Sequence, residues 1–412
     1  MKFFIFSALL LTFALPMPGS AAEVGEGPLT LARVMEMAAS AAPEVRASAA
    51  LVTEGEARLA GAKVRTLENP QLELEAGPRS AEEDSVDFGV GLEIPVELWG
   101  RRDKRIAVAE AGLQREMFLA REARRQAVSA TVGAYYQVLH ARKGLELTYE
   151  RKALAEELER IARERYRTGD APLFEINLAR TEVARASSDI ASAKGQMAQA
   201  RAVLAQSLGL SAGSALQVEG DLEDRSFFDR FHAEKVMAQR PDLLAARAEV
   251  EASEAGVALA RAELRPDVAL RLSYHEEGDE KVGLAGVAVG LPFLNPRRDA
   301  PVREAMARSR RAEIIAEAKE AAVSTQIEGA RLAYEGAVEA VRRMEEDALP
   351  LQRENQSMAT ESYRSGKIDL ATLLQVRREA LETRREYLDR LLNASEAGVG
   401  LASAVGTFSN QP

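Results

Sequence analysis

One motif occurs twice in this chain, and the repeat constrains the fold more than any other feature. Tyr-Arg-Thr-Gly at 166–169 recurs as Tyr-Arg-Ser-Gly at 363–366, about 197 residues later. Two further pairs keep the same order and nearly the same spacing: Pro43 with Pro241, and Ile94-Pro95 with Leu291-Pro292. A fixed period indicates copies of one structural unit. We therefore expect a two-fold internal repeat, with its copies at 23–227 and 228–412.

Residues 1–22 have the pattern of a secretory signal peptide. Lys2 is followed by an almost wholly apolar run at 3–17 and by small residues at 19–22, and this run is too short for a membrane-spanning helix. We expect cleavage after Ala22, with a buried N-terminal helix as the alternative.

Composition excludes several classes of function. The chain has no cysteine, so we expect neither disulfides nor a thiol-ligated metal. Its net charge of −10 argues against a nucleic-acid-binding protein. Charged residues make up 29% of the chain and aromatic residues 5%, which suits long exposed helices better than a large compact core.

Each copy is expected to contain one helical segment, a strand pair and a hairpin of long helices. The first helical segments are predicted at 29–66 and 229–264, each ending shortly before a proline, where a helix cannot continue. A helix over 103–167, which contains no proline, would be about 100 Å long at the usual rise per residue. Its counterpart over 303–364 contains Pro350, which predicts a kink or a short break.

The turns after the long helices are short. Gly169 and Gly366 are expected to be the left-handed residues that end them. Asp170 and Asp369 are then candidate caps of the returning helices, predicted at 173–208 and 370–405. The segment 211–230 is the expected linker between the copies.

Two segments change from helical periodicity to strict alternation, which predicts strand pairs at 70–97 and 266–293. Phe88, Val90 and Leu92, for example, alternate with glycine and glutamate, as in a strand with one apolar and one polar face. Each strand is about as long as a tilted strand that crosses a bilayer. The fourth segment is rich in glycine and its pattern is less clear.

Four such strands cannot close a membrane barrel, because small barrels need about eight, and an open sheet edge does not occur in lipid. If the strands span a membrane, the chain must therefore assemble with copies of itself. A solvated coiled coil is the alternative for the helices alone, but it gives no reason for the alternating strands.

These features together resemble the TolC-type outer membrane efflux proteins over essentially the whole mature chain. The resemblance implies a mainly α fold with a membrane β-barrel portion: a long α-helical barrel and four transmembrane strands per chain, closed by trimerisation. It also implies a homotrimer in outer membrane lipid that extends into the periplasm, where it meets a periplasmic adaptor and an inner-membrane pump of the RND type.

Within that family, the segment 94–102 resembles the heavy-metal branch, which serves cobalt, zinc and cadmium exporters. The implied function is a passive duct for heavy-metal cations or small toxic solutes. A duct for type I protein secretion and a periplasmic coiled-coil scaffold remain as alternatives. Some relatives carry a lipidated cysteine, which this chain lacks, so we expect the barrel alone to anchor it.

The candidate functional residues lie at the hairpin tips and on the polar strand face. We expect no catalytic residues, cofactor or metal, because His140, His232 and His275 are far apart and in no ligand spacing. At the tips, we hypothesise that arginine–aspartate bonds between chains form a latch, and the alternative is that these residues only cap the helices. On the strand face, the acidic residues predict a pore that prefers cations. The candidate tip and adaptor-contact residues are Tyr166, Arg167, Gly169, Asp170, Tyr363, Arg364, Gly366, Lys367 and Asp369, and the candidate lumen residues are Glu73, Glu75, Glu93 and Arg271.

Overall fold

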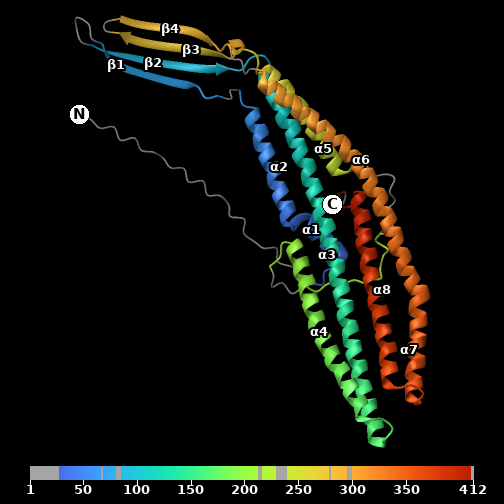
Figure 1. The fold of residues 1–412 in the computed structure, drawn as a ribbon. Helices are drawn as coiled ribbons and strands as arrows, with labels where there is room; N and C mark the ends of the chain where they lie inside the picture. Colours follow the sequence, from blue (N-terminus) through green and yellow to red (C-terminus); the bar gives the residue numbers. More distant parts are fainter. Residues whose placement is uncertain are drawn as a thin grey trace, which may run out of the picture.

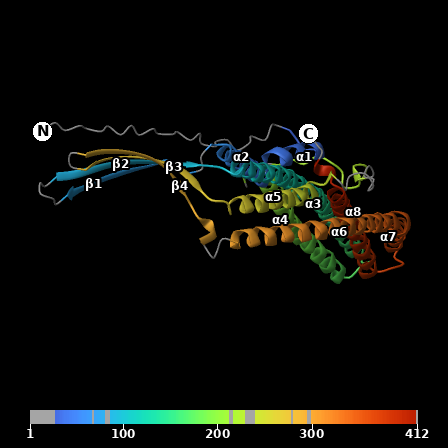
Figure 2. The same ribbon diagram turned by 90° about the horizontal axis from the view of Figure 1, so that it is seen from above.

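The structure is a computed structural model. It describes residues 27–65, 68–79, 85–211, 216–228, 239–277, 280–294 and 299–409, so the predicted signal peptide and His232 lie outside the described residues. The molecule is elongated, with a sheet at one end and the turns of two helical hairpins at the other (Figure 1). A view from above shows the same separation of strands and helices (Figure 2).

The structure has two helices where the sequence predicted one helical segment at 29–66. α1 (Leu31–Ala41) and α2 (Pro43–Ala62) are separated by Ala42, whose ψ of 137° is extended. A residue before proline is driven out of the helical region by the proline ring, so the prediction of one continuous helix over 29–66 was wrong. In the second copy, α5 (Pro241–Ala262) likewise begins at a proline after an extended residue, and the expected earlier start at 229 lies outside the described residues.

The prediction of an unbroken helix over 103–167 is confirmed. α3 (Arg101–Thr168) has 68 residues and returns as α4 (Leu173–Ser207). The counterpart of α3 is divided into α6 (Ala300–Arg343), a π-helical turn at Met344–Ala348 and α7 (Leu349–Arg364). Leu349 donates its N–H to the carbonyl of Met344, five residues back, and the next residue, Pro350, has no N–H to donate. The predicted break is therefore a π turn, after which α8 (Leu370–Ala404) completes the second hairpin.

The four strands form one antiparallel sheet. β1 (Gln71–Arg79), β2 (Ser85–Val96), β3 (Val268–Glu277) and β4 (Glu280–Val289) lie in sequence order. β2 pairs with β3 and joins the two copies, which leaves β1 and β4 as the edges. The predicted fourth strand extended to Phe293, but Pro292–Leu294 is a 3-10 turn.

The main hydrophobic core lies midway along the helices, where α1, α3 and α8 meet the segment between the copies. That segment is more than a connection, because Leu222 and Phe228 are buried in the core. The ring of Phe228 lies directly over Gly398 of α8 and is tilted against the ring of Tyr136 of α3, with centroids 5.5 Å apart. None of the described helices is long and apolar enough to cross a membrane.

Candidate functional site at the hairpin tips

The two hairpin turns have the same backbone geometry. Gly169 and Gly366 have φ values of 83° and 73°, the left-handed conformation that glycine adopts without strain. In the first turn Asp170 donates its N–H to the carbonyl of Arg165 at 2.8 Å, and in the second Lys367 donates to Ser362 at 2.8 Å. Both are the six-to-one bond that closes a helix C-terminus, which confirms the predicted helix ends.

Only one of the two predicted aspartate caps is present. Asp369 accepts the N–H of Thr372 at 2.8 Å and caps α8, and hydrogen bonds from Thr372 lower the pKa of its carboxyl group. Asp170 instead accepts a hydrogen bond from the hydroxyl of Thr168 at 2.6 Å, and Pro172 occupies the cap position of α4. The cap prediction for Asp170 was wrong because Asp170 stands two residues before the cap, where the second turn has Lys367.

The two tip tyrosines occupy different environments although their motifs match. Tyr363 is 1% exposed and donates its hydroxyl to Glu175 at 3.0 Å, while Tyr166 is 47% exposed. The guanidinium of Arg165 lies 4.8 Å from the ring centroid of Tyr363 and 3.7 Å from the Glu175 carboxylate. Burial raises the pKa of Tyr363, and the Glu175 carboxylate adds to this, so the tyrosine stays a hydrogen-bond donor at neutral pH.

We call the set of Arg165, Glu175 and Tyr363 the tip lock. It joins the second hairpin to the first within one chain, and an apolar cluster around it includes Leu158, Ile176, Leu370 and Leu373. Charge-assisted hydrogen bonds of this kind are directional and stronger than neutral ones. The lock and the cluster therefore hold the two tips together.

The sequence prediction missed Arg165 and Glu175. The repeat contains a signal for them, because at the spacing of 197 residues their counterparts are Ser362 and Thr372. A charge present in one copy and absent from the other marks a contact that the two copies do not share.

The other predicted tip residues lie at the surface. Arg167 pairs with Glu164 of its own helix at 3.0 Å, and Arg364 reaches Glu157 of α3 at 3.5 Å. Lys367 is exposed in the second turn. Arg364 thus adds a second charged contact between the hairpins.

A buried ion cluster joins the hairpins farther from the tips. Glu182 of α4 is 4% exposed and accepts a hydrogen bond from Arg378 of α8, with Arg185 at 3.0 Å and Arg151 at 3.5 Å. Burial opposes ionisation of Glu182, but these arginines outweigh it and lower the pKa of the carboxyl group. The contact extends the attachment of α8 to the first hairpin.

The predicted lumen residues share one face of the sheet. Glu93 lies opposite Arg271 in the register, and their side chains form an ion pair at 2.5 Å. Glu73 and Glu75 lie on the same face, beside Gly91 and Gly89 of β2. Leucines and valines fill most of the other face and are largely exposed in the single chain, for example Leu72, Leu74, Leu270 and Leu272.

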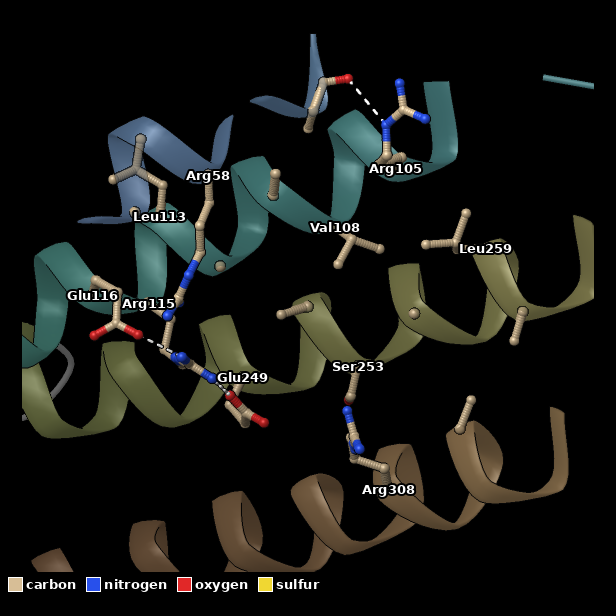
Figure 3. Close-up of a pocket in the computed structure, with 18 of the residues that line it drawn as sticks. Arg58, Arg105, Val108, Leu113, Arg115, Glu116, Glu249, Ser253, Leu259 and Arg308 are labelled. Atoms are coloured by element: carbon tan, nitrogen blue, oxygen red, sulfur yellow. Dashed lines mark hydrogen bonds and ion pairs between the residues drawn. The ribbon is translucent and has the colours of Figure 1, made fainter. Parts of the chain in front are cut away.

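A cavity of about 700 Å³ lies between α2, α3, α5 and α6 near the sheet. Figure 3 shows Arg115 between Glu116 of α3 and Glu249 of α5, and its guanidinium reaches Glu249 at 2.6 Å. Arg58 and Arg308 also line the cavity, and each pairs with a glutamate one turn earlier in its own helix. Because these arginines already have carboxylate partners, we assign the cavity to helix packing.

The histidines do not assemble a metal site in the described part of the chain, where no cluster of three or more histidine, cysteine, aspartate or glutamate residues is placed to hold an ion. The Nε2 of His140 contacts Asp389 of α8 at 2.8 Å. His275 lies over Gly89 in the sheet.

Comparison with known proteins agrees with this architecture. A family model described as Outer membrane efflux protein matches residues 34–210 and again residues 233–407. The cobalt-zinc-cadmium resistance protein CzcC of Cupriavidus metallidurans is 23% identical over 386 residues, which cover 92% of this chain and 90% of that protein.

Solved structures share the fold. The structure of CusC has a TM-score of 0.77 at 19% identity, covering 91% of this chain and 92% of that one. The CmeC outer membrane channel of Campylobacter jejuni has a TM-score of 0.77 at 17% identity, covering 93% of this chain and 87% of that one.

Proposed function

Because the chain belongs to the outer membrane efflux protein family, we propose that three copies of it form the outer membrane duct of a tripartite efflux system that exports heavy-metal cations. The protein resides in the outer membrane and extends into the periplasm. Its partners in this proposal are a periplasmic adaptor and an inner-membrane pump of the RND type.

The observation that carries the proposal of a closed assembly of several copies is the sheet, and the number three follows the family resemblance. One face is apolar and exposed in the single chain, and both edge strands, β1 and β4, lack a second neighbour in the sheet order. Unpaired backbone groups are not tolerated in lipid. If β4 of one copy pairs with β1 of the next, three chains close a barrel of twelve strands, with the apolar face toward lipid.

The tips are proposed to form the periplasmic gate and the adaptor contact. The tip lock supports this role, because it holds the second hairpin against the first. The predicted arginine–aspartate latch between chains stays a prediction. The proposed gate and adaptor-contact residues are Tyr166, Arg167, Gly169, Asp170, Tyr363, Arg364, Gly366, Lys367 and Asp369.

Heavy-metal cations are the proposed substrate class. CzcC, which matches over most of its length, is described as a cobalt-zinc-cadmium resistance protein, and the segment 94–102 carries the resemblance to that branch. A duct needs no catalytic residues, and we propose that this chain performs no enzymatic reaction. Transport then depends on the adaptor and the pump.

The proposal is tested with the purified protein and with a deletion strain. We expect a native mass of three chains in detergent and defined single-channel currents in a planar bilayer. We also expect deletion of the gene to sensitise cells to zinc, cobalt or cadmium salts. A monomer without channel activity would overturn the duct, whereas sensitivity to organic drugs but not to metals would overturn only the substrate class.

Charge on the polar strand face is expected to set ion selectivity. Glu73→Gln combined with Glu75→Gln removes two negative charges per chain from the proposed lumen, so the preference for cations should fall. Arg271→Gln is the matched opposite change, and it should raise that preference. The measurement is the reversal potential under a salt gradient, and equal potentials for the two variants would contradict the assignment of this face to the lumen.

A further inference from the structure

The apolar face of the sheet stops where the helices meet the strands. Its last residues in register are Val96, Val268 and Val289, which lie side by side on β2, β3 and β4. α2 and α5 end, and α3 begins, next to this end of the sheet (Figure 1). In the proposed duct the apolar face contacts the lipid hydrocarbon, so the residues just beyond it lie at the level of the lipid headgroups. Because the helices extend into the periplasm from this end, these headgroups belong to the periplasmic leaflet.

Arginines of α3 tie the ends of α2 and α5 together at this boundary. Arg102 donates a hydrogen bond to the carbonyl of Lys63, which follows α2, at 2.6 Å. Arg101 donates to the carbonyl of Ala262, the last residue of α5, at 3.3 Å. Carbonyls at the end of a helix have no partner within the helix, so these bonds join three segments. We call the joined segments the junction collar, which consists of residues 62–65, 97–105 and 261–267.

The junction collar is basic although the chain is acidic. Its segments contain eight lysines and arginines and four aspartates and glutamates, a net charge of +4, whereas the whole chain carries −10. Among the residues that the structure describes, no carboxylate pairs with four exposed cations of the collar, which are Lys63, Arg65, Lys104 and Arg265. A surface with unpaired cations favours an anionic partner.

Trp99 is exposed beside these cations in a strained conformation. Its φ of 64° is left-handed, and no other non-glycine residue in the described part of the chain has a positive φ. The indole Nε1 donates to the carbonyl of Pro266 at 3.0 Å, and the guanidinium of Arg265 lies 5.9 Å from the ring centroid. The ring is nevertheless 53% exposed, and the adjacent Leu98 is 40% exposed. An amphipathic ring held in this way is typical of tryptophan at a bilayer–water interface.

We propose that the junction collar binds anionic phospholipids of the periplasmic leaflet. Its four unpaired cations contact the headgroup phosphates, while Trp99 and Leu98 lie against the acyl chains. Each lysine or arginine near an anionic leaflet raises the affinity about fivefold, so the collar selects anionic over zwitterionic lipid. The inference rests on the proposed duct, and it names the lipid class that surrounds the chain where the helices leave the membrane.

Fluorescence tests the collar directly, because Trp99 is the only tryptophan of the chain. The protein is reconstituted into phosphatidylcholine vesicles that contain a small fraction of either brominated phosphatidylglycerol or brominated phosphatidylcholine, since bromine quenches tryptophan on contact. We expect brominated phosphatidylglycerol to quench Trp99 severalfold more strongly than the same fraction of brominated phosphatidylcholine. In a variant that combines Lys63→Gln, Arg65→Gln and Lys104→Gln, the two lipids should quench almost equally.

The matched control combines Arg46→Gln, Arg311→Gln and Arg353→Gln, which remove three exposed cations outside the collar. It makes the same change in net charge and should keep the preference for phosphatidylglycerol. Native mass in detergent, measured on the same samples, separates the two levels of the proposal. A trimer that both lipids quench equally, or that neither quenches, would overturn the collar and leave the duct intact. A monomer would overturn both.

Discussion

Glu175→Gln is expected to raise the resting single-channel conductance severalfold. Glu175 is the only carboxylate of the tip lock. It accepts a hydrogen bond from the hydroxyl of Tyr363 and faces the guanidinium of Arg165. A hydrogen bond that involves a charged group contributes about 2 kcal/mol, so its loss would shift a closed–open equilibrium about thirtyfold per chain. Tyr363→Phe keeps the ring over Arg165 and should give a smaller rise.

The matched control is Glu164→Gln. Glu164 carries the same charge at the same tip, but its ion pair is with Arg167 of its own helix, and both side chains are exposed. Recordings in planar bilayers at one salt concentration should show wild-type conductance for this control. If Glu175→Gln and Glu164→Gln gave the same conductance, the tip lock would have no role in closure.

Gly398→Ala is expected to destabilise the fold, whereas Gly400→Ala is expected to stabilise it. A Cβ at position 398 would lie 2.6 Å from the ring of Phe228, while one at position 400 would have no neighbour within 4 Å. Alanine gains about 1 kcal/mol over glycine in a helix, but forcing an extra group into a packed core costs about 1–3 kcal/mol or more. Phe228 is 1% exposed and held by other aromatic rings, so it has little room to move.

Thermal unfolding of the purified protein, followed by circular dichroism, measures both effects. The midpoint should fall for Gly398→Ala and rise slightly for Gly400→Ala, and both glycines lie in the last turns of α8. Phe228→Leu in the Gly398→Ala background should recover part of the loss, because a smaller side chain relieves the contact. An unchanged midpoint for Gly398→Ala would show that the segment around Phe228 moves freely.

Much of the fold could be predicted because its signals are local. Gly169 and Gly366 adopt the left-handed conformation that commonly ends a helix, Pro350 removes a donor, and alternation along Phe88, Val90 and Leu92 specifies a strand. The break at Ala42 was missed although Pro43 follows it. The helical pattern on both sides outweighed the effect of the proline on the preceding residue.

The candidate site was less accessible to prediction because its contacts join distant segments. Tyr166 and Tyr363 stand in matching motifs, and no local rule distinguishes the exposed one from the buried one. Their difference arises because Tyr363 packs against α3 and α4 of the first hairpin, whereas Tyr166 lies on a side of that hairpin that the described part of the chain leaves exposed. Arg165 and Glu175 acquire a role only when Tyr363, almost two hundred positions later, is placed between them.

The π turn at Met344–Ala348 distinguishes the second long helix from α3, which runs from Arg101 to Thr168 without such a turn. Each residue of a plain α-helix turns the chain by about 100°, and a π turn takes up one extra residue locally. The turn therefore sets the rotation of α7 relative to α6, and with it the side of α7 on which Leu349 and Tyr363 are buried.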